Sequence, residues 1–155
     1  MPSITEALVM EHAIFGAVFD QFERVFPKQR TAQEVQWMAT VAEGLLRGHA
    51  DTETNLAYSA LDHVLAEDGR LSRLHQDHHE IDEHFKRVHQ TGEVRQAQHL
   101  LRQAFAATRE HFRREEDIIF PFLERVLRPE TLETLGRAWL GSCPAPAALA
   151  NCAVG

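Results

Sequence analysis

The sequence has no long apolar run, since no stretch approaches the roughly 18 consecutive apolar residues that would suggest a membrane-spanning helix. The first residues, MPSITEALVMEH, lack the basic start and apolar block of a secretory signal, so we expect no signal peptide. No dense run of Lys and Arg is present, and the formal net charge is −7. Nucleic-acid binding needs a basic face, so we expect neither a nucleic-acid nor a membrane partner.

Cysteine, glycine and proline are also scarce. The two cysteines, Cys143 and Cys152, both lie near the C-terminus and make no disulfide framework, so a reducing cytoplasm is the expected location. They are either free thiols or a pair that closes under oxidation. Glycine (8) and proline (6) are few among 155 residues. No segment combines strand-like alternation with β-branched residues, so the chain is expected to be helical.

Local signals place the helices. Ser3 with Glu6 and Thr31 with Glu34 fit capping boxes. Breaks are indicated by Pro27, Asp68-Gly69, Thr91-Gly92 and Pro129. We predict helices over residues 4–25, 32–66, 71–90 and 93–127, with Pro121 kinking or ending the regular part of the last one.

Four helices with short connections predict an all-α fold, an up-down-up-down four-helix bundle. The bundle would occupy residues 1–128 as one domain, because 155 residues suffice for one core but not comfortably for two. Residues 129–155 would add a short helix, over about 130–140, and a loose C-terminal tail.

Histidine is abundant, with ten residues. Because a helix turns about 100° per residue, each histidine can be placed on a helix face. Four of them share a face with apolar residues: His12 with Leu8, Phe15, Phe19 and Phe26; His49 at the margin of Val41, Leu45 and Leu56; His78 with Leu71, Leu74, Ile81 and Phe85; His111 with Leu100, Ala104, Ala107, Ile118 and Phe122. Each predicted helix therefore directs one histidine toward the interior.

Two of these histidines have a glutamate one helical turn later, in the pairs His49–Glu53 and His111–Glu115. A lone histidine near an apolar stripe is more often a core residue than a metal ligand. Four in register with two glutamates favour the opposite interpretation, because burying these polar groups without partners would be costly. A bound metal would remove that cost.

The pattern is also repeated. EHAIFGAVF (11–19) aligns with DHHEIDEHF (77–85), and HADTETNLAYSAL (49–61) aligns with HFRREEDIIFPFL (111–123). Each helical hairpin thus supplies two histidines and one glutamate. Two equivalent half-sites predict two metals bridged by Glu53 and Glu115, since a carboxylate has two oxygens that can bind different ions.

The order H…HxxxE…H…HxxxE, with HxxxEExxhFP (h apolar) at 111–121, resembles the hemerythrin-like (HHE cation-binding) family over about residues 5–127. The resemblance implies a four-helix bundle with a non-haem di-iron centre, whose cofactor is two iron ions. It also implies a small ligand, namely dioxygen, peroxide or nitric oxide, which the protein binds or responds to. The alternatives are a peroxidase-like, catalase-like or nitric-oxide-processing enzyme, or a protein that stores or donates iron.

The third helix departs from the oxygen-carrying hemerythrins, which supply two histidines four residues apart there. This chain has His75, His78 and His79, of which His78 has the best direction. We expect His78 as a ligand and His75 as a seventh, and the frame His75/His79 stays open. Asp82, one turn after His78, is a candidate acceptor for a ligand histidine. Ligand types alone do not separate iron from manganese or zinc.

Overall fold

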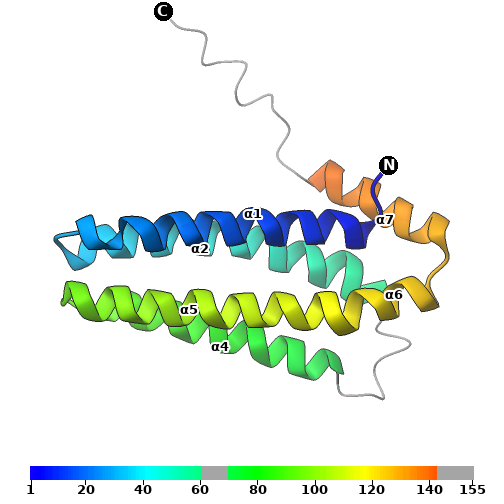
Figure 1. The fold of residues 1–155 in the computed structure, drawn as a ribbon. Coiled ribbons are helices and arrows are strands. Elements are labelled where there is room, and N and C mark those ends of the chain that lie inside the picture. Colours follow the sequence, from blue (N-terminus) through cyan, green and yellow to red (C-terminus); the bar gives the residue numbers. More distant parts are fainter. Residues whose placement is uncertain (61–69, 143–155) are drawn as a thin grey trace, which may run out of the picture.

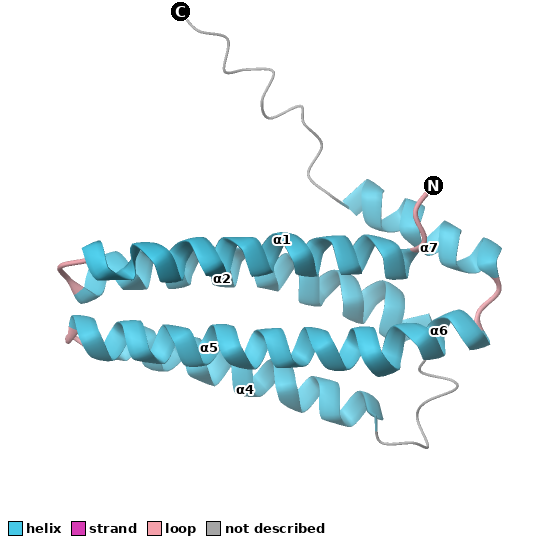
Figure 2. Ribbon diagram, viewed as in Figure 1, coloured by secondary structure: helices cyan, strands magenta, loops and turns pink. Residues whose placement is uncertain are grey.

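The computed structural model describes residues 1–60 and 70–142, and these residues contain helices and short connections but no strand (Figure 2). The α-helices are α1 (Ile4–Val25), α2 (Ala32–Thr52), α4 (Arg70–Gln90), α5 (Val94–Arg114), α6 (Phe120–Val126) and α7 (Pro129–Ser142). A 3-10 turn covers Phe26–Lys28, and two π-helical segments, η2 and η3, cover Glu53–Tyr58 and Glu115–Ile119. The prediction of an all-α fold is confirmed for this part of the chain. The predicted helix end near 66, the Asp68-Gly69 turn, Cys143 and Cys152 lie outside the described residues.

The capping boxes predicted for α1 and α2 are both present. The Ser3 hydroxyl accepts a hydrogen bond from the Glu6 amide at 3.2 Å, while the Ser3 amide donates to the Glu6 carboxylate at 2.8 Å. Thr31 and Glu34 make the same reciprocal pair. These bonds satisfy amide donors that a helix start otherwise leaves free, and they fix where α1 and α2 begin.

The helices α1, α2, α4 and α5 lie side by side, and the α1–α2 and α4–α5 connections lie at the same end of the molecule (Figure 1). This packing is consistent with the expected bundle. The last helix, α7, lies beside the start of α1. Gly136 allows this close approach, because a Cβ there would lie 2.2 Å from the carbonyl oxygen of Pro2. None of the described helices is both long and apolar enough to cross a membrane.

The core has two apolar clusters. One contains Phe15, Phe19, Phe26, Phe85 and Phe105, and the other contains Ile4, Leu8, Tyr58, Leu123 and Trp139. Along α1, His12 falls between Leu8 of the second cluster and Phe15 of the first. The apolar clusters therefore leave a polar layer between them.

The apolar stripe predicted on the second helix was wrong in register. Val41 and Leu45 are 52% and 41% exposed, whereas Val35, Ala39 and Ala42 are fully buried. Small alanines face the neighbouring helices and the larger side chains point outward. As a result His49 lies among the buried residues of α2 and not at the margin of its apolar face.

Each π-helical segment begins at a glutamate of an HxxxE pair. In η2 the Ser59 amide donates to the carbonyl of Thr54, and in η3 the Phe120 amide donates to the carbonyl of Glu115. These five-residue bonds insert one extra residue into the turn. The helix interruption predicted near Pro121 is thus the π-helical segment just before this residue. Pro121 itself lies in the first turn of α6, where a missing amide hydrogen costs no hydrogen bond.

Candidate metal centre

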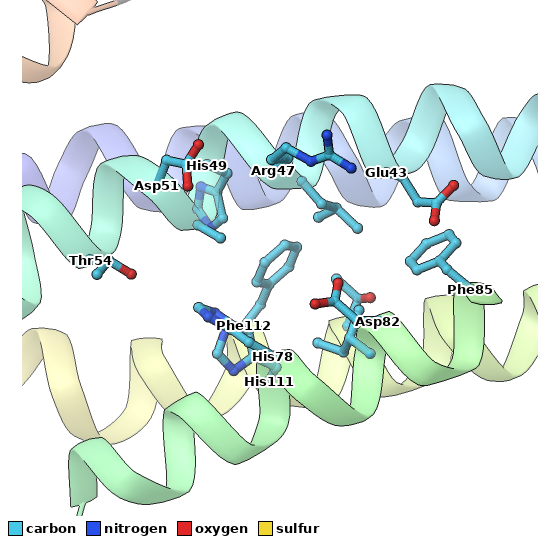
Figure 3. Close-up of a pocket in the computed structure, with 14 residues that line it drawn as sticks. Glu43, Arg47, His49, Asp51, Thr54, His78, Asp82, Phe85, His111 and Phe112 are labelled. Atoms are coloured by element: carbon cyan, nitrogen blue, oxygen red, sulfur yellow. The ribbon is translucent and has the colours of Figure 1, made fainter.

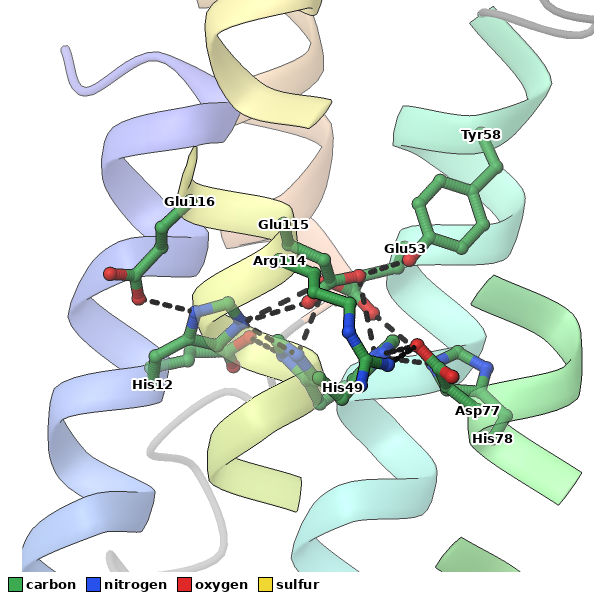
Figure 4. A network of polar contacts seen from close by, with 11 residues as sticks. His12, His49, Glu53, Tyr58, Asp77, His78, Arg114, Glu115 and Glu116 are labelled. Atoms are coloured by element: carbon green, nitrogen blue, oxygen red, sulfur yellow. Dashed lines mark hydrogen bonds and ion pairs between the residues drawn. The ribbon is translucent and has the colours of Figure 1, made fainter. Parts of the chain in front are cut away.

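The polar layer contains histidines from four helices and two glutamates. His12 of α1, His49 of α2 and His111 of α5 are at most 5% exposed, and Glu53 and Glu115 are fully buried. The side chain of His78 of α4 is 21% exposed. All six side chains converge between the helices (Figure 4 labels five of them). Two overlapping groups result, each with donor atoms within 4.8 Å of one another: His12, His49, Glu53 and Glu115; and Glu53, His78, His111 and Glu115.

The imidazoles form two pairs. The Nε2 atoms of His12 and His49 are 3.1 Å apart, and those of His78 and His111 are 2.9 Å apart. Metal–ligand bonds of about 2.0–2.2 Å place neighbouring donors about 2.8–3.6 Å apart in octahedral or tetrahedral geometry. Each imidazole pair therefore has the spacing of two ligands on one ion.

The two glutamates each offer one oxygen to either imidazole pair. Glu53 Oε1 lies 3.3 Å from His49 Nε2, and Glu53 Oε2 lies 3.8 Å from His78 Nε2. Glu115 Oε2 lies 3.5 Å from His12 Nε2, and Glu115 Oε1 lies 3.4 Å from His111 Nε2. This is the arrangement that two bridging carboxylates require.

The polar atoms of the cluster would be satisfied by a bound ion. Both oxygens of Glu53 and Oε2 of Glu115 are buried without a hydrogen-bond partner among the described residues. Buried polar atoms without a partner carry a large free-energy cost, and a fully buried carboxylate more so. The residues present therefore fit a pair of metal ions, which would satisfy these oxygens and the four Nε2 atoms together.

Carboxylates outside the donor groups orient two of the histidines. The Nδ1 atom of His12 lies 2.7 Å from Glu116 Oε1, and that of His49 lies 2.8 Å from Glu11 Oε2. A carboxylate on Nδ1 holds the proton there and turns the Nε2 lone pair toward the centre, as is usual for metal-binding histidines.

The His111 side is arranged differently. Its Nδ1 lies 3.6 Å from Asp77, a buried carboxylate that also accepts from Arg114 and pairs with Arg73 at 3.2 Å. The guanidinium groups compete with His111 for this carboxylate. Of the two pairs, His12 and His49 are thus held by the closer carboxylate contacts.

Tyr58 connects the two π-helical segments. Its hydroxyl donates a short hydrogen bond to Glu115 Oε1, and its ring lies 6.4 Å from that of His78. Burial, together with the nearby Glu53 and Glu115, raises the pKa of Tyr58. The phenol therefore stays protonated and acts as a donor to Glu115.

In the metal-free protein the two glutamates differ in charge. Burial raises the pKa of Glu115 well above its usual range, and the neighbouring Glu53 raises it further. For Glu53, burial also acts upward, but His49, His12 and His111 together outweigh it and the pKa is lowered. Like charges close together disfavour joint ionisation, so one proton stays on Glu115.

The histidines differ as well. Burial alone would lower the pKa of His49, but Glu53 and Glu11 raise it to about 9. Burial lowers the pKa of His78, and burial together with the neighbouring His78 lowers that of His111 to about 4. At neutral pH His49 is thus protonated in the metal-free centre, while His78 and His111 are neutral and can accept an ion without losing a proton.

A cavity of about 430 Å³ opens between α2 and α4 and reaches this centre (Figure 3). His49, His78 and His111 line its inner end. Leu46, Ile81, Phe85 and Phe112 contribute apolar walls. The centre is therefore accessible from one side to small molecules or ions.

The structure brings together six of the seven predicted ligands. The seventh, His75, is exposed, lies outside both donor groups and meets Tyr58 edge-on at 6.1 Å. His79 is exposed on another face of α4, beside Glu80 and Glu83. Asp82 forms no hydrogen bond within the described residues and lines the cavity instead.

Sequence reasoning missed the roles of four residues at this centre: Tyr58, Glu11, Glu116 and Asp77. The internal repeat contained a signal for two of them, because Glu11 and Asp77 occupy the same position, directly before His12 and His78. Tyr58 aligns with Phe120, which has no hydroxyl, so the repeat gave no indication that the Tyr58 hydroxyl has a role.

Comparison with family models, curated proteins and solved structures finds no match to this chain. Its function must therefore be argued from its own residues. These form a buried cluster of histidines and glutamates that could hold a metal ion, and its spacing suits two.

Proposed function

We propose that this chain is a hemerythrin-like, non-haem di-iron protein that binds or responds to dioxygen, peroxide or nitric oxide. In this proposal α1, α2, α4 and α5 form an up-down-up-down four-helix bundle, and His12, His49, Glu53, His78, His111 and Glu115 hold two iron ions. The order of these residues along the chain supports the family assignment.

One observation carries the proposal. Each buried glutamate directs one oxygen toward the His12/His49 pair and the other toward the His78/His111 pair. A single ion beside either imidazole pair would leave at least one oxygen of Glu53 without a partner. Two ions give every oxygen and every Nε2 atom a partner, and bound iron would supply redox chemistry and open coordination positions.

The remaining residues have defined roles. Glu11 and Glu116 hold the protons on the Nδ1 atoms of His49 and His12. Phe112 stacks on His12 with ring centroids 3.9 Å apart and keeps water from this side. Tyr58 donates to Glu115 and keeps a proton next to the centre. The cavity between α2 and α4 admits the small ligand.

The test is the iron content of protein reconstituted with ferrous iron without oxygen and passed through a desalting column. We expect about two iron ions per chain, as the ligand set of carboxylate-bridged centres requires. Glu53→Gln should bind less iron at both positions, whereas Glu80→Gln, on the outer face of α4, should bind as the parent does. A saturated value of one iron or less per chain would exclude the dinuclear centre.

An enzymatic version of this function is favoured by one observation. The cavity reaches His78 and His111, so a peroxide can approach the donor groups directly, with the Tyr58 phenol nearby. Repeated turnover of hydrogen peroxide by the iron-loaded protein would indicate a peroxidase-like or catalase-like enzyme. Binding of oxygen or nitric oxide without turnover would indicate a carrier or sensor.

A further inference from the structure

We propose that the cavity between α2 and α4 is the route by which the metal ion enters, and that carboxylates at its rim draw the hydrated divalent cation inward. The inference rests on the proposed metal centre. It assigns a role to residues that bind no metal in the final state, namely Glu43, Asp51 and Asp82 (Figure 3).

The described residues close the other sides of the centre. Phe112 and Phe120 cover His12, with ring centroids 3.9 and 5.6 Å from its own, and are 5% and 3% exposed. Tyr58, 2% exposed, covers the centre toward the second apolar cluster. His78 has 21% side-chain exposure against 2–3% for the other three imidazoles. An ion arriving through the cavity therefore meets His78 first.

The charges at the rim suit a cation. Asp51 and Asp82 are exposed, and neither forms an ion pair or hydrogen bond within residues 1–60 and 70–142. Glu43 bonds to the exposed His89 at 2.7 Å. Arg47 is the one arginine or lysine among the residues lining the cavity, against the three carboxylates, and His49 lies deeper, at the centre itself. A cleft lined mainly by one sign of charge concentrates ions of the opposite sign and raises their association rate.

The size of the cavity also suits a hydrated ion. Six water molecules at about 30 Å³ each occupy about 180 Å³, and the cavity offers about 430 Å³. An ion can therefore reach His78 with its water shell and exchange water for imidazole and carboxylate ligands inside. A diatomic ligand alone needs far less space.

The experiment measures how fast the metal-free protein takes up Co²⁺, followed by stopped-flow visible absorption at low and high salt. Asp82→Asn and Asp51→Asn should each slow association at low salt, and the double variant by about tenfold. Near 1 M salt, where charges are screened within about 3 Å, the difference should disappear. Arg47→Gln should act oppositely and speed association. All should reach the same final Co²⁺ content as the parent.

Two controls separate steering from other effects. Glu80→Gln removes the same charge from α4 outside this cavity and should load at the parental rate. Ala50→Leu narrows the cavity without changing charge and should slow loading at every salt concentration. Parental rates in the Asp51, Asp82, Arg47 and Ala50 variants would overturn the route while leaving the centre intact. A parent that takes up no Co²⁺ at equilibrium would overturn the centre itself.

Discussion

Tyr58 and Glu115 belong to different π-helical segments, and the phenol of one donates a hydrogen bond to the carboxyl group of the other. Both are buried. Each segment contains one extra residue in its helical turn, and this bond joins the two segments across the bundle. The π-helical turns therefore act together, directing Glu53 and Glu115 into the same layer.

Tyr58→Phe should destabilise the metal-free protein by about 1–2 kcal/mol, because the buried Glu115 loses its hydrogen-bond donor. Urea unfolding after metal removal measures this change. The variant should still bind two metals, since all six His and Glu donors remain and the Tyr58 hydroxyl donates to Glu115, but with lower affinity. Loss of one metal would mean that the phenol is itself a ligand.

Thr5→Val is the matched control for this variant. The Thr5 hydroxyl is buried and donates to Glu124 at 2.8 Å, away from the metal centre. Because Glu124 is exposed and water can replace the lost donor, its removal should cost no more than about 1 kcal/mol of unfolding free energy. Metal affinity should stay at the parental value in Thr5→Val and fall only in Tyr58→Phe.

His78→Ala should lower the metal content of saturated protein from about two ions per chain to about one, since each ion needs both imidazoles of its pair. His79→Ala should keep the parental content, because His79 is exposed outside the donor groups. Elemental analysis of the two variants decides between them. The reverse result would establish the frame His75/His79, and His75→Ala would then also lose metal.

The helix bounds followed from local chemistry and were predicted well. Capping boxes at Ser3 and Thr31 fix two helix starts within the sequence itself, so α1 covers the predicted 4–25 and α2 begins at the predicted residue 32. Apart from His75, the residues of the buried His/Glu cluster were also predictable, because a helix face depends only on spacing along one helix.

Features that depend on contacts between helices were not predictable. Val41 and Leu45 had the hydrophobicity of core residues, but the helices approach through Ala39 and Ala42, which leaves larger side chains outside. The π-helical segments have no sequence signal comparable to a capping box. The bond from Tyr58 to Glu115 joins residues 57 positions apart and depends on both segments.

Gly136→Ala should destabilise the packing of α7 on α1, because the new Cβ would lie 2.2 Å from the carbonyl oxygen of Pro2 and the backbone must shift. We expect a loss of about 1–3 kcal/mol in urea unfolding. Gly141→Ala is the control on the same helix, where a Cβ meets nothing within 4 Å. That change should be neutral or stabilising by up to about 1 kcal/mol.

Metal removal should leave a helical protein with a lower melting temperature, because the ligands meet only in the folded chain and binding free energy adds to folding. At a metal concentration of about 100 times Kd the difference corresponds to about 2.7 kcal/mol. Thermal melts of metal-free and iron-loaded protein at neutral pH measure it. Equal melting temperatures would show that these residues do not hold the metal.

Acidification should destabilise the metal-free protein between about pH 6.5 and 4. The pKa of His111 is about 4 in the folded protein and near its ordinary value of 6.5 in the unfolded chain. In this window the unfolded chain binds a proton that the folded protein does not, so the free energy of unfolding falls as the pH falls. Urea unfolding at several pH values measures this, and His111→Gln should flatten the dependence.

Metal affinity should rise with pH up to about 9. In the metal-free protein the pKa of His49 is about 9, because Glu53 and Glu11 outweigh the opposite effect of burial. Below pH 9 His49 carries a proton that an incoming ion must displace. For each proton released on binding, the apparent metal affinity rises about tenfold per pH unit. Competition titrations with a coloured chelator between pH 6.5 and 9 measure the slope.

Glu11→Gln is the decisive variant for this prediction. Glu11 accepts from His49 Nδ1 at 2.8 Å and raises its pKa. Without this carboxylate the His49 pKa should fall, so fewer protons are released near pH 8 and the rise in affinity should level off at a lower pH. Glu6→Gln removes the same charge one helical turn and a half earlier on α1 and should leave the pH dependence unchanged. If Glu11→Gln levels off at the same pH as the parent, His49 is not the group whose proton competes with the metal.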